Sequence, residues 1–303
     1  MEQSFLAYLR GRTRDLRQVD VGIGDDAAVI RSPRSPMVVC ADQIIDGVDF
    51  DRQSQNLADV GYKAMAINLS DIAAMGAVPD SAIVTLTLPQ DDATIIAGDC
   101  YEGIIEAAKR FDVAIAGGDI STYDGPLAIN VALLGHITEG GRPWLRSEAQ
   151  EGDVVLATGQ FGGSLRGRHL RPEPRIEFAT AVRQLADVHA AIDVSDGFSL
   201  DLDRLCASSG YGVELDVDAI PIHPDAVAMS AKSGKSAFHH AWSDGEDFEL
   251  LLSVSPEDAD RLLSATLPAP ITAVGKIIGR TGLWKMQSGK YIRMAPQGYQ
   301  HTE

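Results

Sequence analysis

Aspartates stand beside glycines or at the ends of apolar runs at several places in the chain. Residues 21–28 carry two adjacent aspartates between glycines and alanines, and Asp119 follows Gly117 and Gly118. Carboxylates that converge repel one another, by roughly 4 kcal/mol for two charges about 4 Å apart at an effective dielectric constant of about 20. Such a cluster needs cations, and Mg²⁺ held by carboxylates would also attract the phosphates of a nucleotide. The candidates are Asp25, Asp26, Asp42, Asp71, Asp119, Asp193 and Asp196.

The segment 21–28 also allows a second interpretation. Gly22, Gly24 and Ala27 have the G-x-G-x-x-A spacing of a dinucleotide-binding loop, which receives a pyrophosphate at a helix N-terminus. Asp25 and Asp26 would then face an anion, which is unfavourable unless a cation lies between them. The other carboxylates favour a metal-dependent phosphoryl-transfer enzyme that lacks a P-loop.

The periodicity of apolar residues predicts the elements that must position these side chains. The most regular helix covers residues 57–76, ends at Gly76, and puts Asn68 and Asp71 on one face. Helices and strands alternate in both halves, which predicts an α/β or α+β fold. Further helices are expected at 2–11, 91–111, 176–189, 199–208, 225–232 and 256–267, and strands at 28–30, 37–41, 82–88, 113–116, 127–137, 153–158, 191–194, 213–217, 248–254, 271–278 and 283–294, with 168–175 extended.

Composition bounds the class of protein. The chain has 303 residues, and 26 basic against 43 acidic side chains give a formal net charge of -17, which disfavours nucleic acid and anionic membranes as partners. The three cysteines show no C-x-x-C spacing, so neither zinc nor a disulfide framework is indicated. Because no leader-like or membrane-spanning run is evident, we expect a cytoplasmic protein. A Gly- and Pro-containing stretch at 139–152 predicts two domains, 1–140 and 141–303.

Five segments together resemble the thiamine-monophosphate kinase family, within the AIR synthase-like superfamily. They are Gly22-Ile23-Gly24-Asp25-Asp26-Ala27-Ala28, Asn68-Leu69-Ser70-Asp71-Ile72-Ala73-Ala74-Met75-Gly76-Ala77, Gly117-Gly118-Asp119, Asp193-Val194-Ser195-Asp196-Gly197 and Gly245-Glu246-Asp247-Phe248-Glu249-Leu250. The resemblance implies an N-terminal domain that binds ATP and Mg²⁺ and dimerises through its sheet into a shared barrel, followed by a C-terminal α/β domain. It also implies transfer of the ATP γ-phosphoryl group to thiamine monophosphate, a small-molecule phosphate acceptor, which gives thiamine diphosphate.

The resemblance also implies the site residues. The implied ligands of several Mg²⁺ ions are Asp26, Asp42, Asp71, Asp119, Asp193 and Asp196, the implied ATP contacts are Tyr101, Gly118, Asp119, Arg146 and Ser195, and the implied acceptor contacts are Asp49, Glu246 and Tyr299. No catalytic acid or base is expected. A phosphate monoester is largely a dianion near pH 7, so the acceptor needs no activation and direct in-line transfer suffices.

Two departures from the family pattern touch the site. Cys40 and Ala41 stand where the family has two hydroxyl residues, and Asp49 stands where it has a substrate-contacting histidine. A carboxylate cannot donate to a phosphate, so weak use of thiamine monophosphate, or a less anionic acceptor, is expected unless a cation such as Arg168 or Arg171 intervenes. Two alternatives remain: an AIR synthase-like enzyme that uses ATP on another acceptor, and a nucleotide-binding homologue whose catalysis has decayed.

Overall fold

The computed structural model describes residues 19–21, 29–30 and 35–300. These residues form two compact units. The first unit comprises Ala77–Arg142 and the described residues up to Ile72, and the second comprises Ala73–Gly76 and the described residues from Pro143 onward. The expected helix at 2–11 and the glycine-rich loop with Asp25 and Asp26 lie outside the described residues.

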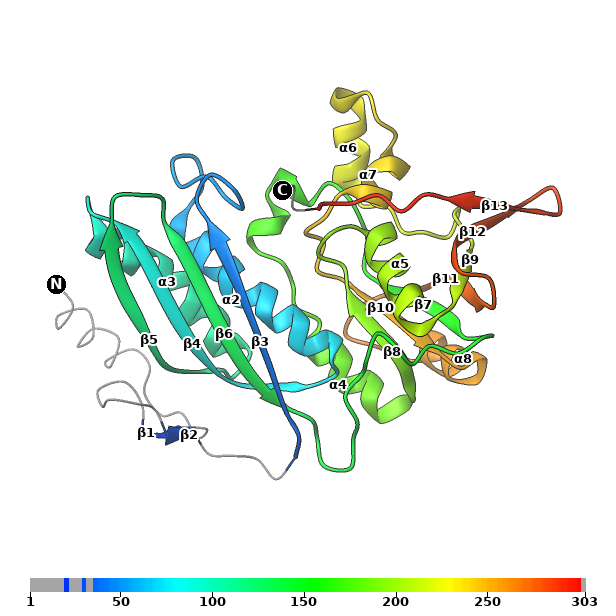
Figure 1. The fold of residues 1–303 in the computed structure, drawn as a ribbon, viewed down its shortest axis with the longest axis horizontal. Helices are drawn as coiled ribbons and strands as arrows, with labels where there is room; N and C mark the ends of the chain where they lie inside the picture. The colour runs from blue at the N-terminus through cyan, green and yellow to red at the C-terminus, as the bar shows by residue number, and fades with distance from the viewer. Residues whose placement is uncertain (1–18, 22–28, 31–34, 301–303) are drawn as a thin grey trace. The chain divides into compact units, whose positions relative to one another are not determined.

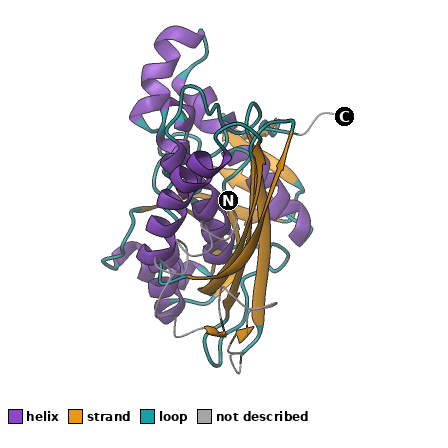
Figure 2. Ribbon diagram, turned by 90° about the vertical axis from the view of Figure 1, so that its left-hand side faces the viewer, coloured by secondary structure: helices purple, strands orange, loops and turns teal. Residues whose placement is uncertain are grey.

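The first unit is a four-stranded sheet with two long helices on one face (Figure 1). The strand order is β3-β6-β4-β5, antiparallel except for the parallel pair β4 and β5. Figure 2 shows the long twisted strands close to edge-on, with helices along one side. The elements are β3 (Met37–Ile45), α2 (Leu57–Ala74), β4 (Val78–Pro89), α3 (Ala93–Arg110), β5 (Ala114–Tyr123) and β6 (Ala128–His136), and a separate antiparallel pair is formed by β1 (Val19–Val21) and β2 (Val29–Ile30).

Two glycines allow α2 and α3 to pack closely. A Cβ atom at Gly61 would lie 1.9 Å from the carbonyl oxygen of Cys100, and one at Gly103 would lie 1.7 Å from that of Ala58. No other residue type fits at these two positions, because such distances are far below van der Waals contact. The helix pair buries an almost continuous apolar face, including Val60, Met65, Leu69, Ile72, Ile96, Ile104 and Ile105.

The end of α2 has the geometry of a Schellman motif. Gly76 adopts a φ of 61°, its amide donates to the carbonyl of Ala73, and the amide of Ala77 donates to that of Ile72. The helical residues end at Ala74, two positions before the predicted end, and Gly76 is confirmed as the residue that stops the helix.

The second unit is a seven-stranded mixed sheet with helices on both faces. The strand order is β13-β12-β9-β11-β7-β10-β8, and only β12 and β9 are parallel neighbours. Phe198, Leu202 and Leu205 of α5 form one core with Val155, Ala157, Ile192 and Leu251 of the sheet, while α8 packs on β7 and β11 and contacts α4. The strands are β7 (Val154–Thr158), β8 (Val188–Asp193), β9 (Gly212–Leu215), β10 (Leu250–Val254), β11 (Ile271–Ile278), β12 (Gly282–Gln287) and β13 (Lys290–Met294). The helices are α4 (Ile176–Leu185), α5 (Phe198–Ser209), α6 (Pro224–Ser233), α7 (Ala237–Ser243) and α8 (Pro256–Ser264), with short 3-10 turns η1 (Ser164–Arg166) and η2 (Arg168–Leu170).

Several sequence predictions need correction. The segment 168–175 is not wholly extended, because residues up to Leu170 form η2 ahead of the two prolines. The helix from Ile176 ends at Leu185, and Val188 already belongs to β8. The expected strand at 283–294 is a hairpin, because Ser288 and Gly289 both have positive φ and reverse the chain. The short helix α7 was not predicted.

Candidate functional site

Two predicted metal ligands of the first unit lie together. The pKa of Asp42 is raised by burial, and a hydrogen bond with the side chain of Asp71 partly offsets that rise. Asn68 of α2 accepts from the amide of Asp42 at 3.1 Å, and Asn130 donates to its carbonyl at 3.2 Å. Two carboxyl groups that share a hydrogen bond between a strand and a helix form an oxygen-rich donor set suited to a hard divalent cation.

Asp119 lies on the opposite face of the same sheet from Asp42. Across the sheet Asp42 stands opposite Val131, Val131 opposite Val84, and Val84 opposite Gly118. Neighbours in register share a face, so the side chain of Asp119 points to the other side, where it is exposed. The prediction that Asp119 lies at the end of a strand is wrong. Asp119 lies inside β5, which continues to Tyr123. Asp42 is likewise inside β3.

Other predicted contacts of the first unit have clear structural surroundings. Tyr101 is buried in α3, and burial raises the pKa of its hydroxyl. A Cβ atom at Gly118 would lie 1.8 Å from the carbonyl oxygen of Val84, so the pairing of β4 with β5 requires glycine there. Asp49 accepts a hydrogen bond from the amide of Ile45 at 2.7 Å, and the buried Lys63 donates to the carbonyl of Asp49 at 3.0 Å. Cys40 makes long sulfur contacts with Asn68, 3.5 Å to its carbonyl and 3.6 Å to its side-chain oxygen.

The second unit brings together residues that are far apart in sequence. Asp193 ends β8, one residue before the predicted end at Val194, and is buried, and the chain then turns through Ser195 and Asp196 into α5. The amide of Glu246 donates to the carbonyl of Ser195 at 2.7 Å, and the amide of Tyr299 donates to that of Asp196 at 2.8 Å. Predicted ATP, metal and acceptor residues therefore meet at one edge of the sheet. Arg146 is exposed, and its carbonyl accepts from Ser209 at 2.8 Å.

Asp196 has a cationic neighbour that sequence reasoning missed. Arg204 of α5 donates to Asp196 at 2.5 Å and to the buried Asp201 at 2.7 Å. Asp201 in turn accepts from the amides of Asp196 and Gly197 at 2.9 and 3.2 Å. The helical spacing of Asp201 and Arg204, three residues apart, was the available signal.

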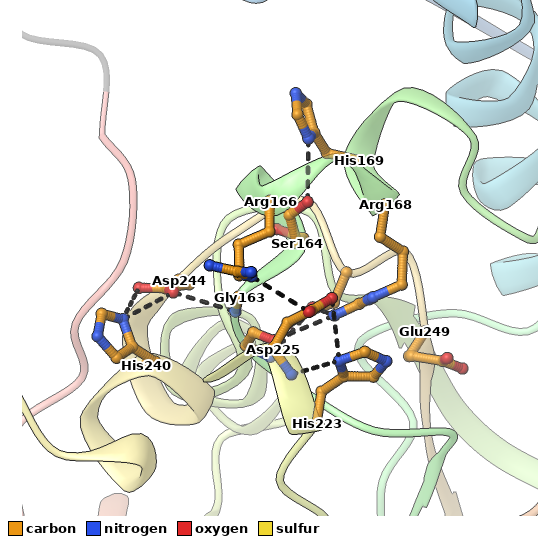
Figure 3. Close-up of polar contacts among 12 residues, drawn as sticks. Gly163, Ser164, Arg166, Arg168, His169, His223, Asp225, His240, Asp244 and Glu249 are labelled. Atoms are coloured by element: carbon orange, nitrogen blue, oxygen red, sulfur yellow. Dashed lines mark hydrogen bonds and ion pairs between the residues drawn. The ribbon is translucent and has the colours of Figure 1, made fainter. Parts of the chain in front are cut away.

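A cavity of about 380 Å³ opens beside β7 in the second unit. Arg168, Arg175, His223 and Glu249 line it, and Figure 3 labels Arg168, His223 and Glu249. Each guanidinium already has a carboxylate partner: Arg168 pairs with Asp247 and Arg175 with Glu249. The pKa of His223 is lowered by burial and by the charge of Arg168.

Within residues 35–300 and the two short strands before them, no three His, Cys, Asp or Glu side chains are gathered closely enough to hold a metal ion. Asp26 lies outside the described residues. None of the helices that the structure describes is long and apolar enough to cross a membrane.

The fold and these motifs match known proteins. Residues 24–137 match the family model for the N-terminal domain of AIR synthase related protein, and residues 130–283 match that for its C-terminal domain. The chain is thus an AIR synthase-related protein of two domains. It is 59% identical over its full length to thiamine-monophosphate kinase of Rhodopirellula baltica, of which it covers 98%. The chain belongs to the thiamine-monophosphate kinase family.

Solved structures agree with this assignment. The crystal structure of thiamine-monophosphate kinase from Stenotrophomonas maltophilia K279a has a TM-score of 0.80 and 31% identity, with 94% of this chain and 96% of that chain covered. The structure of AaThiL complexed with AMPPCP and TMP has a TM-score of 0.78 and 26% identity, with 99% of this chain and 97% of that chain covered.

Proposed function

We propose that this chain transfers the γ-phosphoryl group of ATP to thiamine monophosphate and forms thiamine diphosphate, with Mg²⁺ required. The observation that carries the proposal is the 59% identity to a thiamine-monophosphate kinase over 100% of the chain. The complex of AaThiL, 26% identical, with AMPPCP and TMP supports ATP and thiamine monophosphate as the ligand classes.

The proposed roles are those that the family resemblance implies. Asp42 and Asp71 would hold Mg²⁺ in the first unit, with Asp26, Asp119, Asp193 and Asp196 as the remaining proposed ligands. The proposed ATP contacts remain Tyr101, Gly118, Asp119, Arg146 and Ser195, and the proposed acceptor contacts Asp49, Glu246 and Tyr299. The amide of Glu246 donates to the carbonyl of Ser195 at 2.7 Å, so a proposed ATP contact and a proposed acceptor contact are neighbours in the second unit.

The proposed reaction requires that these residues position the two substrates and supply charge, and it requires no general base. The acceptor phosphate is already anionic near pH 7, so no side chain must remove a proton from it. Mg²⁺, when bound, offsets the repulsion between two phosphate groups. The task left to the protein is to fix Asp42 through Asn68 and Asn130, and to fix Ser195 against Glu246.

The proposal includes a cytoplasmic homodimer. Met37, Val39 and Ile83 are 42%, 65% and 39% exposed. All three lie on the face of the four-stranded sheet opposite to α2 and α3 (Figure 1). An apolar sheet face of this kind favours pairing with a second copy of the chain.

A coupled ADP-release assay tests the function. Thiamine monophosphate and a panel of other phosphorylated acceptors are compared at saturating ATP, with and without Mg²⁺. ADP release with thiamine monophosphate that depends on Mg²⁺ supports the proposal. ADP release only with a different acceptor supports the alternative of an AIR synthase-like enzyme that uses ATP on that acceptor, which is the alternative that Asp49 favours. No release with any acceptor supports a homologue whose catalysis has decayed.

A further inference from the structure

The loop of residues 244–248, which carries Glu246, has an unusual main-chain conformation. Glu246 and Phe248 have φ values of 62° and 51°, in the left-handed region that residues other than glycine rarely adopt. Such conformations persist where the surrounding structure over-determines them, and they cluster at ligand-binding positions. The contacts that impose this conformation are therefore candidates for a role in binding.

One side of the 244–248 loop is held by the strand β8 and the turn that follows it. The amide of Glu246 donates to Ser195 at 2.7 Å, and the amide of Phe248 donates to Val194 at 2.8 Å. The amide of Val194 donates to the carbonyl of Glu249 at 2.7 Å. The main chain on both sides of the Glu246 side chain is thus anchored.

The other side is held by two consecutive glycines. The amide of Gly162 donates to both carboxylate oxygens of Asp247, at 3.1 and 2.9 Å, and the amide of Gly163 donates to Asp244 at 3.2 Å. Both glycines have positive φ, 88° and 76°, a backbone conformation that glycine adopts readily. Figure 3 shows Asp244 between Gly163 and His240, whose ring nitrogen lies 2.9 Å from the carboxylate.

Arg168 completes the contact at Asp247. The Asp247 side chain is fully buried, and Arg168 donates to it at 3.0 Å. The same guanidinium nitrogen donates to the carbonyl of Gly162 at 3.1 Å, so one cation ties the glycine turn to the loop. Ser164 adds a bond from its hydroxyl to the carbonyl of Gly245 at 2.6 Å.

We propose that Asp247 and Arg168 are positioning residues that hold Glu246 in place for the phosphorylated acceptor. The proposal rests on the proposed function, since it takes Glu246 as an acceptor contact. Neither residue need touch the acceptor. Each acts through the main chain of Glu246. When either side chain is removed, the 244–248 loop can depart from the conformation that presents the Glu246 carboxylate to the acceptor.

Kinetics of Asp247→Asn give the first test. Asparagine has the same size but no charge, and it has an NH₂ group where Asp247 has its second oxygen, which accepts from the Gly162 amide at 2.9 Å. The variant therefore loses the charge-assisted bond with Arg168 and sets two donors against each other at Gly162. We expect KM for thiamine monophosphate to rise roughly tenfold, because binding must then order the loop, while KM for ATP stays within about twofold. Asp153→Asn is the matched control: Asp153 is as buried, 3% against 4% exposed, and accepts from Ser253 and Gln150 away from the loop.

Two further variants make the test specific. Arg168→Lys retains a cation and should restore most of the acceptor affinity that Arg168→Met loses; Arg168 is a quarter exposed, so both variants should fold even if Asp247→Asn does not. In a Glu246→Ala background, Asp247→Asn should add no further rise in KM, since residues that act through one group are not additive.

Amide hydrogen exchange supplies a readout that does not depend on activity. The amides of Glu246 and Phe248 should exchange faster in Asp247→Asn and in Arg168→Met than in wild type or Asp153→Asn. The proposal is overturned by unchanged exchange, by an unchanged KM for thiamine monophosphate, by an equal rise in Asp153→Asn, or by additivity with Glu246→Ala. A wild-type chain that releases no ADP with thiamine monophosphate overturns the proposed function instead, and exchange then still decides whether Asp247 and Arg168 hold the loop.

Discussion

Arg204 and Asp196 form a 2.5 Å ion pair at the start of α5, and the same guanidinium nitrogen reaches Asp201 at 2.7 Å. Asp201 is 1% exposed and accepts from the amides of Asp196 and Gly197. Arg204 thus neutralises a buried carboxylate that holds the turn on which Asp196 stands. Contacts within the second unit therefore suffice to hold the turn at residues 196–197.

Arg204→Met should destabilise the chain by about 1–2 kcal/mol, because the buried Asp201 loses its cation. The partial exposure of Arg204, 38%, keeps this figure below that of a fully buried pair. Urea denaturation followed by circular dichroism measures the change. Arg204→Lys, which keeps the charge, should recover part of the loss, and a Met variant as stable as wild type would contradict the role assigned to Arg204.

Asp71→Asn should abolish turnover and leave the fold intact. The variant keeps a hydrogen-bonding group beside Asp42 while it removes a proposed Mg²⁺ ligand. We expect kcat to fall at least about a hundredfold, as when a charge-stabilising group is lost from an active site. ADP release and a thermal melt should be measured on the same preparation. Failure to obtain soluble protein would mean that Asp71 is a structural residue.

Asp49 has a structural contact that its sequence position did not reveal. Its carboxylate accepts from the amide of Ile45 at 2.7 Å, so Asp49→His changes the turn as well as the charge. Asp49→Asn keeps an acceptor for that amide and removes the charge. If Asp49 faces the acceptor, Asp49→Asn should raise kcat/KM for thiamine monophosphate by about tenfold, and Asp49→His by about ten- to a hundredfold.

Asp49→Ala, which loses both the charge and the turn contact, is the control for Asp49→Asn. The idea is contradicted if wild type already has a high kcat/KM for thiamine monophosphate and if Asp49→Asn and Asp49→His do not raise it. A cation would then compensate the charge of Asp49. The buried Lys63, which donates to the carbonyl of Asp49 at 3.0 Å, is a candidate for this cation.

Val39→Asp should convert the proposed dimer to a monomer. Val39 is 65% exposed in the single chain, on the uncovered face of β3, and a carboxylate there would be buried without a partner in a dimer that uses this face. Light scattering coupled to gel filtration gives the mass. Val227→Asp, 55% exposed on α6, is the matched control and should leave the mass unchanged. A wild-type monomer, or a Val39→Asp dimer, would contradict the proposed interface.

Segments with a regular apolar periodicity and a clear stop residue, such as glycine, were predictable from the sequence. The helix around Asn68 and Asp71 is regular over five turns and ends at a glycine, so its position followed from local signals alone. Asp193 likewise follows a short apolar strand and ends β8. Both elements carry side chains whose chemistry depends on local spacing, which a sequence displays.

Long-range pairing was not predictable in the same way. Asp119 was expected at the end of a buried strand, where parallel sheets bind ligands. Both sheets are mostly antiparallel, and β5 runs on past Asp119 along β4, which turns its side chain to the exposed face. The contacts of Asp247 with Gly162 and Arg168 span about 80 residues, and no local pattern encodes them.

The pH dependence of stability offers a last prediction, at Asp247. Burial raises the pKa of its carboxyl from 3.8 to about 7, while Arg168 and the Gly162 amide act in the opposite direction and Glu249 adds to the rise. Between about pH 4 and pH 7, the Asp247 carboxyl is therefore protonated in the folded chain and ionised in the unfolded chain. This group's contribution to stability is fully present below about pH 4 and is lost as pH rises through about 7.

Asp247→Asn has no such proton and serves as the reference. The free energy of unfolding of wild type minus that of Asp247→Asn should fall from pH 5 to pH 8, as measured by urea denaturation at each pH. The subtraction removes the contributions of all other titrating groups that the substitution leaves unchanged. A difference that grows with pH would show that Arg168 outweighs burial and keeps Asp247 ionised in the folded chain.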